Sequence, residues 1–394
     1  MWRQRALSWV ESMREPDSVC CYRLHEQAEP TVFASFFALF TLHLCTVTET
    51  WNEQRRLEWL EFVRNFQDEE TGLFRDPGAA SRVTDPAHDL EHLDRQLTGF
   101  SVSALKVVGG QPRYPIRAVW PWFDPDYMRR WLDGLDWKRS SNSGNKAMFI
   151  AIMLIDELER GQSEAARGLD AWFDWHDRMA DPATSYWGTG RSCRYFQGMN
   201  GFVHQFLIYN YMDRQVPLLH AAVDRTLLLQ QPDGLFSPML GGGACDDLDA
   251  LHVLCYAHHA LNYRRADIGR ALEGARAALL ANQNPDGGFS WARRRLLSPG
   301  EWIRLAVHNS RTADPYPYLL YVALRLALAG QRHLRRPQRT GWCSSGWGWS
   351  ESSIWDTWFR TLTIAEIDAV VDPAAARRHW RRIDAPNFGW FILP

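Results

Sequence analysis

Several features that would assign this chain to a specialised class are missing from its sequence. No Cys-x-x-Cys pair occurs and the seven cysteines are an odd number, so we expect reduced thiols rather than a disulfide framework. The most apolar run, residues 31–47, contains His43 and is short for a membrane span. The N-terminal stretch has the pattern of an amphipathic helix and lacks the apolar core of a signal peptide. These absences favour a globular protein of the cytoplasm, without an integral membrane segment.

An excess of basic side chains is also missing. Lys and Arg together number 44 and Asp and Glu 46, which gives a net charge of −2. Because nucleic-acid-binding surfaces are strongly basic, we expect no nucleic acid as a partner. What is abundant is tryptophan, with 20 Trp beside 12 Tyr and 19 Phe. So much aromatic surface must either fill the space between helices or line a cavity.

Strand signals are scarce, and two kinds of helical pattern alternate along the chain instead. Segments that mix charged residues with apolar stripes are typical of half-exposed helices, and nearly all-apolar segments are typical of buried ones. The half-exposed set comprises residues 2–13, 51–66, 125–135, 163–179, 217–230, 267–283 and 374–382. The buried set comprises residues 31–47, 89–107, 145–159, 200–213, 246–263, 314–329 and 354–369.

One loop motif recurs three times, at residues 66–74, 230–237 and 283–290. Each copy runs from glutamine through aspartate and glycine to phenylalanine, and each lies between a half-exposed and a buried segment. We expect the glycine to form a turn, the glutamine to bond the backbone of that turn, and the phenylalanine to fill a groove between helices. Such recurrence is typical of repeat architectures. The sequence therefore predicts one all-α domain over residues 1–394, an (α/α)6-type toroid of outer and inner helices, with an open solenoid as the alternative.

These motifs resemble those of the prenyltransferase and squalene cyclase (terpenoid cyclase) superfamily. The loop at 283–290 is similar to its glutamine–glycine–aromatic repeat, and Ser-Ile-Trp-Asp-Thr-Trp at 353–358 is similar to a stretch that opens a late inner helix. Asp246 and Asp247, after three glycines, resemble the end of the family's Asp-x-Asp-Asp acid motif, in which Ala244 replaces the first aspartate. The resemblance implies a toroid in which Asp246 donates a proton and Asp247 is its partner.

The stretch at 314–318 resembles the family segment that supplies a zinc-binding histidine in the protein prenyltransferases, but Pro317 stands at that position. A zinc-dependent prenyltransferase is therefore disfavoured, and we expect neither a metal nor another cofactor. His88 and His92 are spaced for one helical face, and His204 on another helix is a conceivable third metal ligand. Hydrogen-bonded or solvated histidines are the commoner explanation of such a pattern.

In a toroid the inner helices begin at one rim of a central cavity, where their positive dipole ends collect. The polar and aromatic residues near those starts are therefore the predicted substrate-binding residues. They are Asp89, His92, Asn145, Lys146, His204, Asp314, Tyr316, Tyr318, Trp355 and Asp356. Among them Lys146 is a candidate for binding an anion such as a diphosphate or a carboxylate.

The predicted catalytic residues are Asp246, Asp247 and Asp249, three carboxylates within four residues. They repel one another, so at least one should keep its proton in a dry site and serve as a general acid. The alternative is that they cap a helix, for which aspartate is well suited. Asp249 has the further alternative of an ion pair.

Three functions follow from these observations. The first is a terpene-cyclase-like enzyme with an aspartate general acid that acts on an isoprenoid, with aromatic rings that stabilise a carbocation. The second is a carbohydrate-active toroid, whether a hydrolase, a lyase or an epimerase, since the predicted rim is rich in Asp, His and Tyr. The third is a non-enzymatic repeat scaffold. A pocket without an apolar lower half would favour the second, and an open groove would favour the third; in the enzymatic cases the partner is a small-molecule substrate.

Overall fold

The structure is a computed structural model that describes residues 1–83, 90–189, 194–238, 240–293, 298–311 and 340–388. It is an assembly of α-helices with one small antiparallel sheet, in which β1 (Tyr22–Arg23) pairs with β2 (Pro30–Thr31). The predicted all-α fold is confirmed.

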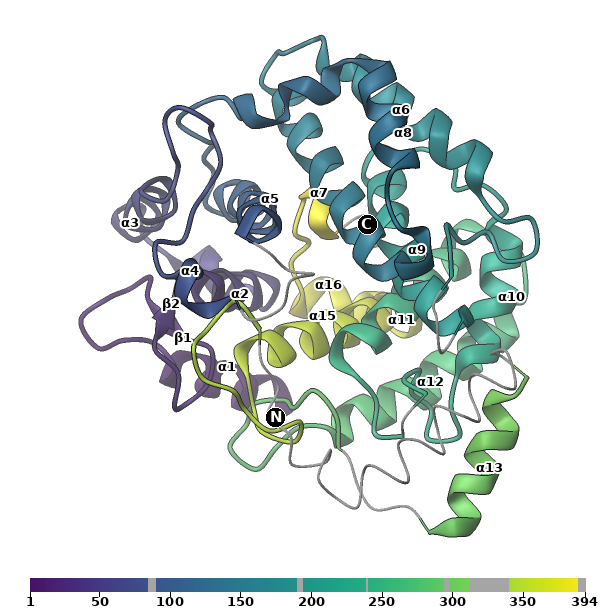
Figure 1. Ribbon diagram of the computed structural model, residues 1–394. Helices are drawn as coiled ribbons and strands as arrows, with labels where there is room; N and C mark the ends of the chain where they lie inside the picture. Colours follow the sequence, from purple (N-terminus) through teal and green to yellow (C-terminus); the bar gives the residue numbers. More distant parts are fainter. Residues whose placement is uncertain (84–89, 190–193, 239, 294–297, 312–339, 389–394) are drawn as a thin grey trace.

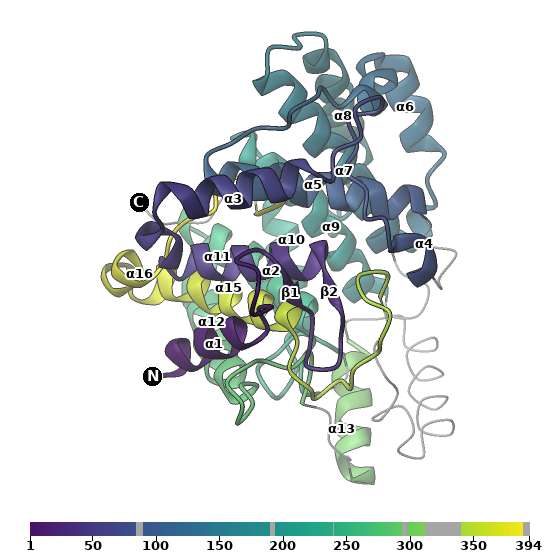
Figure 2. The ribbon, with the colours of Figure 1, turned by 90° about the vertical axis from the view of Figure 1, so that its left-hand side faces the viewer.

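Among the described helices, six nearly all-apolar ones lie at the centre of the molecule (Figure 1). They are α2 (Val32–Leu44), α5 (Leu90–Val108), α7 (Ser140–Glu159), α9 (Arg194–Tyr211), α11 (Ala244–Ala260) and α15 (Ile354–Val371). Each packs against the next in this order, and α15 packs back against α2. Figure 2 shows α2, α5 and α15 side by side from another direction. These helices match six of the seven predicted buried segments; the seventh, 314–329, lies outside the described residues.

A second set of helices covers this central group and turns charged faces to the solvent. Within the described ranges α3 packs on α5, α8 on α7, α10 on α9 and α11, and α12 on α11 and α15. The set comprises α1 (Trp2–Ser12), α3 (Glu53–Arg64), α6 (Pro125–Asp133), α8 (Ala165–Met179), α10 (Leu219–Leu229), α12 (Arg265–Ala281) and α16 (Pro373–His379). The half-exposed segments predicted from the sequence are these helices.

Short elements complete the chain, and the sequence analysis did not predict them. They are α4 (Ala79–Arg82), α13 (Pro299–Asn309) and the 3₁₀ helices η1 (Val47–Thr50), η3 (Arg117–Phe123), η4 (Trp137–Arg139) and η6 (Pro386–Phe388). Local side chains set several helix starts: Thr31 caps α2 by accepting from the Ala34 amide, and Ser353 caps α15 by accepting from the Asp356 amide. Such caps satisfy amides that have no partner within the helix.

The three recurring loops share one hydrogen-bonding scheme. In each, the glutamine side-chain amide donates to the carbonyl of the glycine four or five residues later, and it also bonds the backbone of a neighbouring segment. Each of these glycines has a positive φ, which glycine adopts without strain. The pairs are Gln67 and Gly72 (3.0 Å), Gln230 and Gly234 (2.8 Å), and Gln283 and Gly287 (2.8 Å). The predicted role of the glutamine is confirmed.

The phenylalanine of each loop is fully buried, as predicted. Its backbone amide donates to a side chain of an inner helix, and this hydrogen bond joins the loop to that helix. The acceptors are Thr98 Oγ1 for Phe74 (2.9 Å), Asp247 Oδ1 for Phe236 (2.7 Å) and Thr357 Oγ1 for Phe289 (2.9 Å). We call each of these hydrogen bonds between loop and inner helix a joint. The acceptor is an aspartate in the second joint and a threonine in the other two.

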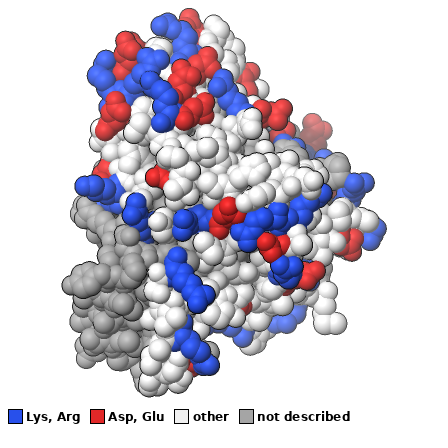
Figure 3. Space-filling model, turned by 90° about the vertical axis from the view of Figure 1, so that its right-hand side faces the viewer, with Lys and Arg blue, Asp and Glu red and all other residues white. Residues whose placement is uncertain are grey.

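The surface shown in Figure 3 carries basic and acidic side chains interspersed with uncharged stretches. Among the described helices, none has both the length and the apolarity that crossing a bilayer requires. The six described cysteines are free thiols: Cys20, Cys21, Cys45, Cys245, Cys255 and Cys343.

Candidate functional site

A cavity of about 640 Å³ lies among the inner helices α5, α7, α9, α11 and α15, within the size range of small-molecule pockets. The loop around Trp342 and the 3₁₀ helix η6 also contribute to its wall. At one end lie exposed residues that precede or open α7 and α9, including Lys138, Arg139 and Gln197. This end, called the mouth below, therefore carries two positive side chains and helix N-termini, as the sequence analysis expected of the rim.

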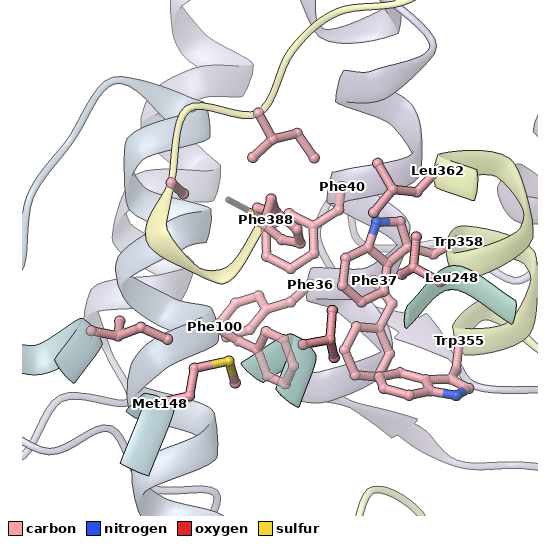
Figure 4. Close-up of a cluster of buried hydrophobic side chains, with 14 of the residues drawn as sticks. Phe36, Phe37, Phe40, Phe100, Met148, Leu248, Trp355, Trp358, Leu362 and Phe388 are labelled. Carbon is pink, nitrogen blue, oxygen red and sulfur yellow. The ribbon is translucent and has the colours of Figure 1, made fainter. Parts of the chain in front are cut away.

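Part of the cavity lining is an apolar wall, to which α15 contributes more residues than any other helix. Trp355 and Phe359 have ring centroids 4.0 Å apart, and Trp342 lies 4.2 Å from Trp355. Behind them Phe37 of α2 stacks on Trp358 at 5.4 Å, so the wall is backed by a continuous aromatic core (Figure 4). The apolar lining comprises Phe100, Met148, Phe149, Val203, Leu207, Leu248, Trp342, Trp355, Trp358, Phe359, Leu362 and Phe388.

Polar side chains also line the cavity, and α7, α9 and α11 supply most of them. Asn145 and His204, both predicted from the sequence, lie 3.2 Å apart between Nδ2 and Nε2. Burial lowers the pKa of His204 to about 4, so its ring is neutral at pH 7. Since Nε2 accepts from the Asn145 amide, the ring proton resides on Nδ1. The remaining polar lining inside the mouth comprises Gln96, Asn200, Asp249, His252, Glu366 and Asn387.

Asp247 lies outside the cavity lining. Its carboxylate is fully buried, accepts hydrogen bonds from the amides of Phe236 (2.7 Å) and Gly243 (3.0 Å), and forms an ion pair with the fully buried Arg360. Every contact joins the loop, α11 and α15 to one another. Asp247 is thus a structural residue, in keeping with the capping alternative.

Asp246 is half-buried beside the cavity, and it is not among the lining residues. Its Oδ1 accepts from Asn200 Nδ2 at 3.1 Å and from Cys245 Sγ at 3.8 Å. The position that the family resemblance assigns to the proton donor therefore bonds to the neighbouring helix α9.

Asp249 does line the cavity. Burial first, and then the negative charges of Asp246 and Asp247, raise its pKa well above the usual range of an aspartate. No side chain or backbone amide among the described residues hydrogen-bonds or ion-pairs with its carboxyl. Of the three aspartates, this is the one in the cavity lining, and its raised pKa favours the protonated form.

A histidine–glutamate pair also lines the cavity, and the sequence analysis missed it. His252 Nδ1 lies 2.7 Å from Glu366 Oε1, and the two side chains are 3% and 4% exposed. Two signals were present in the sequence: His252 follows Asp249 by three residues, which places both on one helical face, and Glu366 is an acid in a mostly apolar segment. Their pairing joins α11 to α15 and was not visible in either segment alone.

Three other predicted residues lie apart from the cavity lining. His92 is buried on α5, with its ring centroid 6.4 Å from that of Phe149. Lys146 is half-buried on α7. Asp356 is fully buried at the start of α15, where Ser353 Oγ donates to it at 2.7 Å, and burial raises its pKa to about 7.

Trp355 lies in the cavity wall, as predicted. Asp89, Asp314, Tyr316, Tyr318 and His88 lie outside the described residues. The described part of the chain contains no group of three or more His, Cys, Asp or Glu side chains arranged to hold a metal ion. Because His88 lies outside the described residues, a metal site at His88 and His92 remains a prediction.

No protein-family model matches the chain, and no curated protein matches it in sequence. The function is therefore inferred from the geometry of the cavity.

Proposed function

We propose that the chain is an α/α toroid enzyme of the terpene-cyclase-like kind, which protonates an isoprenoid in the central cavity with Asp249 as the general acid. The single observation that carries the proposal is the buried carboxyl of Asp249, whose pKa is raised, in the lining of a cavity that also carries Trp355, Trp358 and Phe359. This assignment moves the acid from Asp246, where the motif resemblance places it, to the residue that lines the cavity.

Support for the toroid comes from the order of the helix contacts. Among the described helices, α2, α5, α7, α9, α11 and α15 each contact the next, and the last contacts the first. The partly charged helices pack outside them. Closure of the inner set encloses a cavity, whereas an open solenoid would leave a groove, and this favours an enzyme over a scaffold.

The proposed chemistry uses both the polar and the apolar residues of the cavity lining. Asp249 donates its proton to a carbon–carbon double bond or to an epoxide oxygen, which leaves a positive charge on the substrate. The rings of Trp355, Trp358 and Phe359 then face that charge, and each aromatic face stabilises a desolvated cation by about 2 kcal/mol. The apolar wall also excludes water, which would otherwise quench the cation. At the mouth, Lys138 and Arg139 suit a substrate with an anionic end.

A carbohydrate-active enzyme is the second candidate, because Asp249 and Glu366 place two carboxyl groups on one cavity. Glycoside hydrolysis uses such a pair. The apolar wall favours the isoprenoid, since a sugar presents hydroxyl groups on every edge and would leave them unpaired against Trp358 and Leu362.

A cytoplasmic location also remains a proposal. It rests on the cysteines, because the described ones are free and a reducing compartment maintains that state.

A thermal-shift panel tests the substrate class. Geranylgeranyl diphosphate, geranylgeraniol and a uronate tetrasaccharide are added separately to the purified protein, and ligand at a hundredfold excess over Kd stabilises the folded state by about 2.7 kcal/mol. We expect the two isoprenoids to raise the melting temperature by several degrees and the sugar to leave it unchanged. A shift with the sugar alone would overturn the isoprenoid proposal in favour of the carbohydrate enzyme.

A further inference from the structure

The cavity contains a second group equipped for proton transfer, the pair of His252 and Glu366. The 2.7 Å contact joins Nδ1 of the imidazole to Oε1 of the carboxylate. A ring nitrogen held in this way is the donor, so the other nitrogen, Nε2, is left with its lone pair free. Phe206 packs at a right angle to the imidazole ring with centroids 5.6 Å apart and fixes its plane.

The free atoms of this pair are buried and without partners. Neither His252 Nε2 nor Glu366 Oε2 has a hydrogen bond from any described residue, although both side chains are more than nine-tenths buried. An unsatisfied buried polar atom costs about 1–3 kcal/mol, so its persistence calls for a ligand that satisfies it. Since both residues line the cavity, a molecule that occupies the cavity is placed to bond these two atoms.

The pair lies beside the proposed acid. Asp249 and His252 are three residues apart on α11, which puts their Cβ atoms about 5–6 Å apart on the cavity side of the helix. Side chains this close together can reach nearby carbon atoms of one substrate molecule, but not the two ends of a long isoprenoid chain. An acid and a base thus face the same part of the substrate.

We infer that His252, oriented by Glu366, is the base that ends the reaction by removing a proton from the substrate. The product is then an isomer of the substrate and not a hydrated alcohol. This inference rests on the proposed function, because it needs the cation that Asp249 generates. Glu366 is a positioning residue that holds the ring and stabilises the imidazolium once it forms, the role of the carboxylate in other histidine–carboxylate pairs.

The proton and electron balance closes without a co-reactant. The Asp249 O–H bond breaks as a C–H bond forms from the double-bond electrons, which leaves a carboxylate and a carbocation. His252 Nε2 then takes a proton from a carbon next to the cation, and the electrons of that C–H bond form the new double bond. The imidazolium returns its proton to the Asp249 carboxylate, so nothing is oxidised, reduced or added.

The test incubates the protein with geranylgeranyl diphosphate or geranylgeraniol in D₂O and analyses the products by mass spectrometry. The exchangeable proton of Asp249 becomes deuterium, so the wild type should give an isomer that is heavier by one deuterium. His252→Asn keeps an N–H donor for Glu366 but lacks Nε2, and should lower isomer formation about 100-fold or more. Residual product of this variant should include the deuterated alcohol that water capture gives.

A positioning role for Glu366 and a base role for His252 are separated from structural roles by chemical rescue. His252→Ala leaves room for imidazole, and added imidazole should raise the turnover rate of this variant at least tenfold. Imidazole should do nothing for Glu366→Gln, which keeps the ring but loses the charge that holds it. The matched control is His176→Asn, a fully buried histidine on α8 whose Nδ1 bonds the Trp172 carbonyl, whose ring packs among tryptophan rings and which is outside the cavity lining. At matched melting temperature its turnover should stay within about twofold of wild type.

The outcomes distinguish the two proposals. No deuterated product from the wild type contradicts the proposed function. If His252→Asn forms the deuterated isomer at the wild-type rate and in the wild-type proportion, the proposal that Asp249 is the acid stands. The proposal that His252 is the base is then wrong. If His252→Asn does not fold, the imidazole response of His252→Ala at matched melting temperature decides the same question, and absence of any response counts against the base.

Discussion

Helices α11 and α15 begin in the same way and present different chemistry to the cavity. In both, the second, fifth, sixth and ninth residues line the cavity, and the third and fourth do not. At those four positions α11 carries Cys245, Leu248, Asp249 and His252, and α15 carries Trp355, Trp358, Phe359 and Leu362. One repeat thus carries the proposed acid and base, while its counterpart carries aromatic and leucine side chains.

The comparison also explains why the aspartate cluster is misleading. Asp246 and Asp247 occupy the same positions in α11 as Asp356 and Thr357 in α15. The fourth residue of each helix accepts the amide of the loop phenylalanine, so Asp247 does the work of Thr357 and needs Arg360 to balance its charge. Asp247 belongs to the contact between loop and helix, and Asp246 bonds to α9, whereas Asp249, at the sixth position, lines the cavity.

The largest effect is expected from breaking the charged joint. Asp247→Ala removes the acceptor of the Phe236 and Gly243 amides and leaves Arg360 buried without its partner. Removing one member of a buried ion pair costs about 3–5 kcal/mol of unfolding free energy. Urea denaturation of the variant and the wild type measures this loss directly.

The neutral joint provides the matched change. Thr357→Val removes the acceptor of the Phe289 amide and creates no unpaired charge, so about 1–3 kcal/mol should be lost. A loss for Asp247→Ala no greater than that for Thr357→Val would show that the ion pair with Arg360 adds nothing, and the contrast between the two joints would fail.

A pH effect on stability should separate Asp249 from its neighbours. Its pKa is raised in the folded state from an unfolded value near 3.8, so the folded protein holds a proton that the unfolded chain releases. Stability from this group is full below pH 4 and is lost as the pH rises through the folded pKa. Asp249→Asn cannot lose that proton. The variant should therefore gain in melting temperature relative to the wild type as the pH rises from 5 to 8.

Other groups titrate in the same pH range, but their contributions are the same in both proteins and cancel in the difference in melting temperature between Asp249→Asn and wild type. The pKa values of Asp156 and Asp356 are raised to about 7 by burial, so they too lose stability as the pH rises from 4 to 7. His204 acts in the opposite sense, because its pKa of about 4 costs stability as the pH falls below 6.5. A melting difference between Asp249→Asn and wild type that does not change with pH would mean that the carboxyl is ionised in the folded protein.

The fold could be predicted from the sequence to a large extent, because burial leaves a periodic pattern within each segment. The segment predicted at 354–369 is a helix at Ile354–Val371, and the loop phenylalanines are buried as expected. The 3₁₀ helices that were missed, such as η4 at Trp137–Arg139, are too short to show a period, whereas α13 at Pro299–Asn309 is long enough and was overlooked.

The site could be predicted only in part, because it depends on the rotation of each helix and on pairs between helices. Asn145, His204, Asp249 and Trp355 were named and line the cavity. Choosing Asp246 over Asp249 followed a motif, and helical phase alone does not separate the two, because residues three positions apart lie on one face of a helix. The contact of His252 with Glu366 spans 114 residues of sequence, and no local pattern reveals it.

The central claim is that Asp249, and not Asp246, supplies the proton, and turnover in D₂O tests it most directly. Wild type, Asp249→Asn and Asp246→Asn are incubated with geranylgeranyl diphosphate, and deuterium in the product is quantified. We predict a loss of at least about 100-fold for Asp249→Asn, as expected for removal of a general acid, and less than about tenfold for Asp246→Asn. Full deuterium incorporation by Asp249→Asn, or a loss confined to Asp246→Asn, would contradict the account.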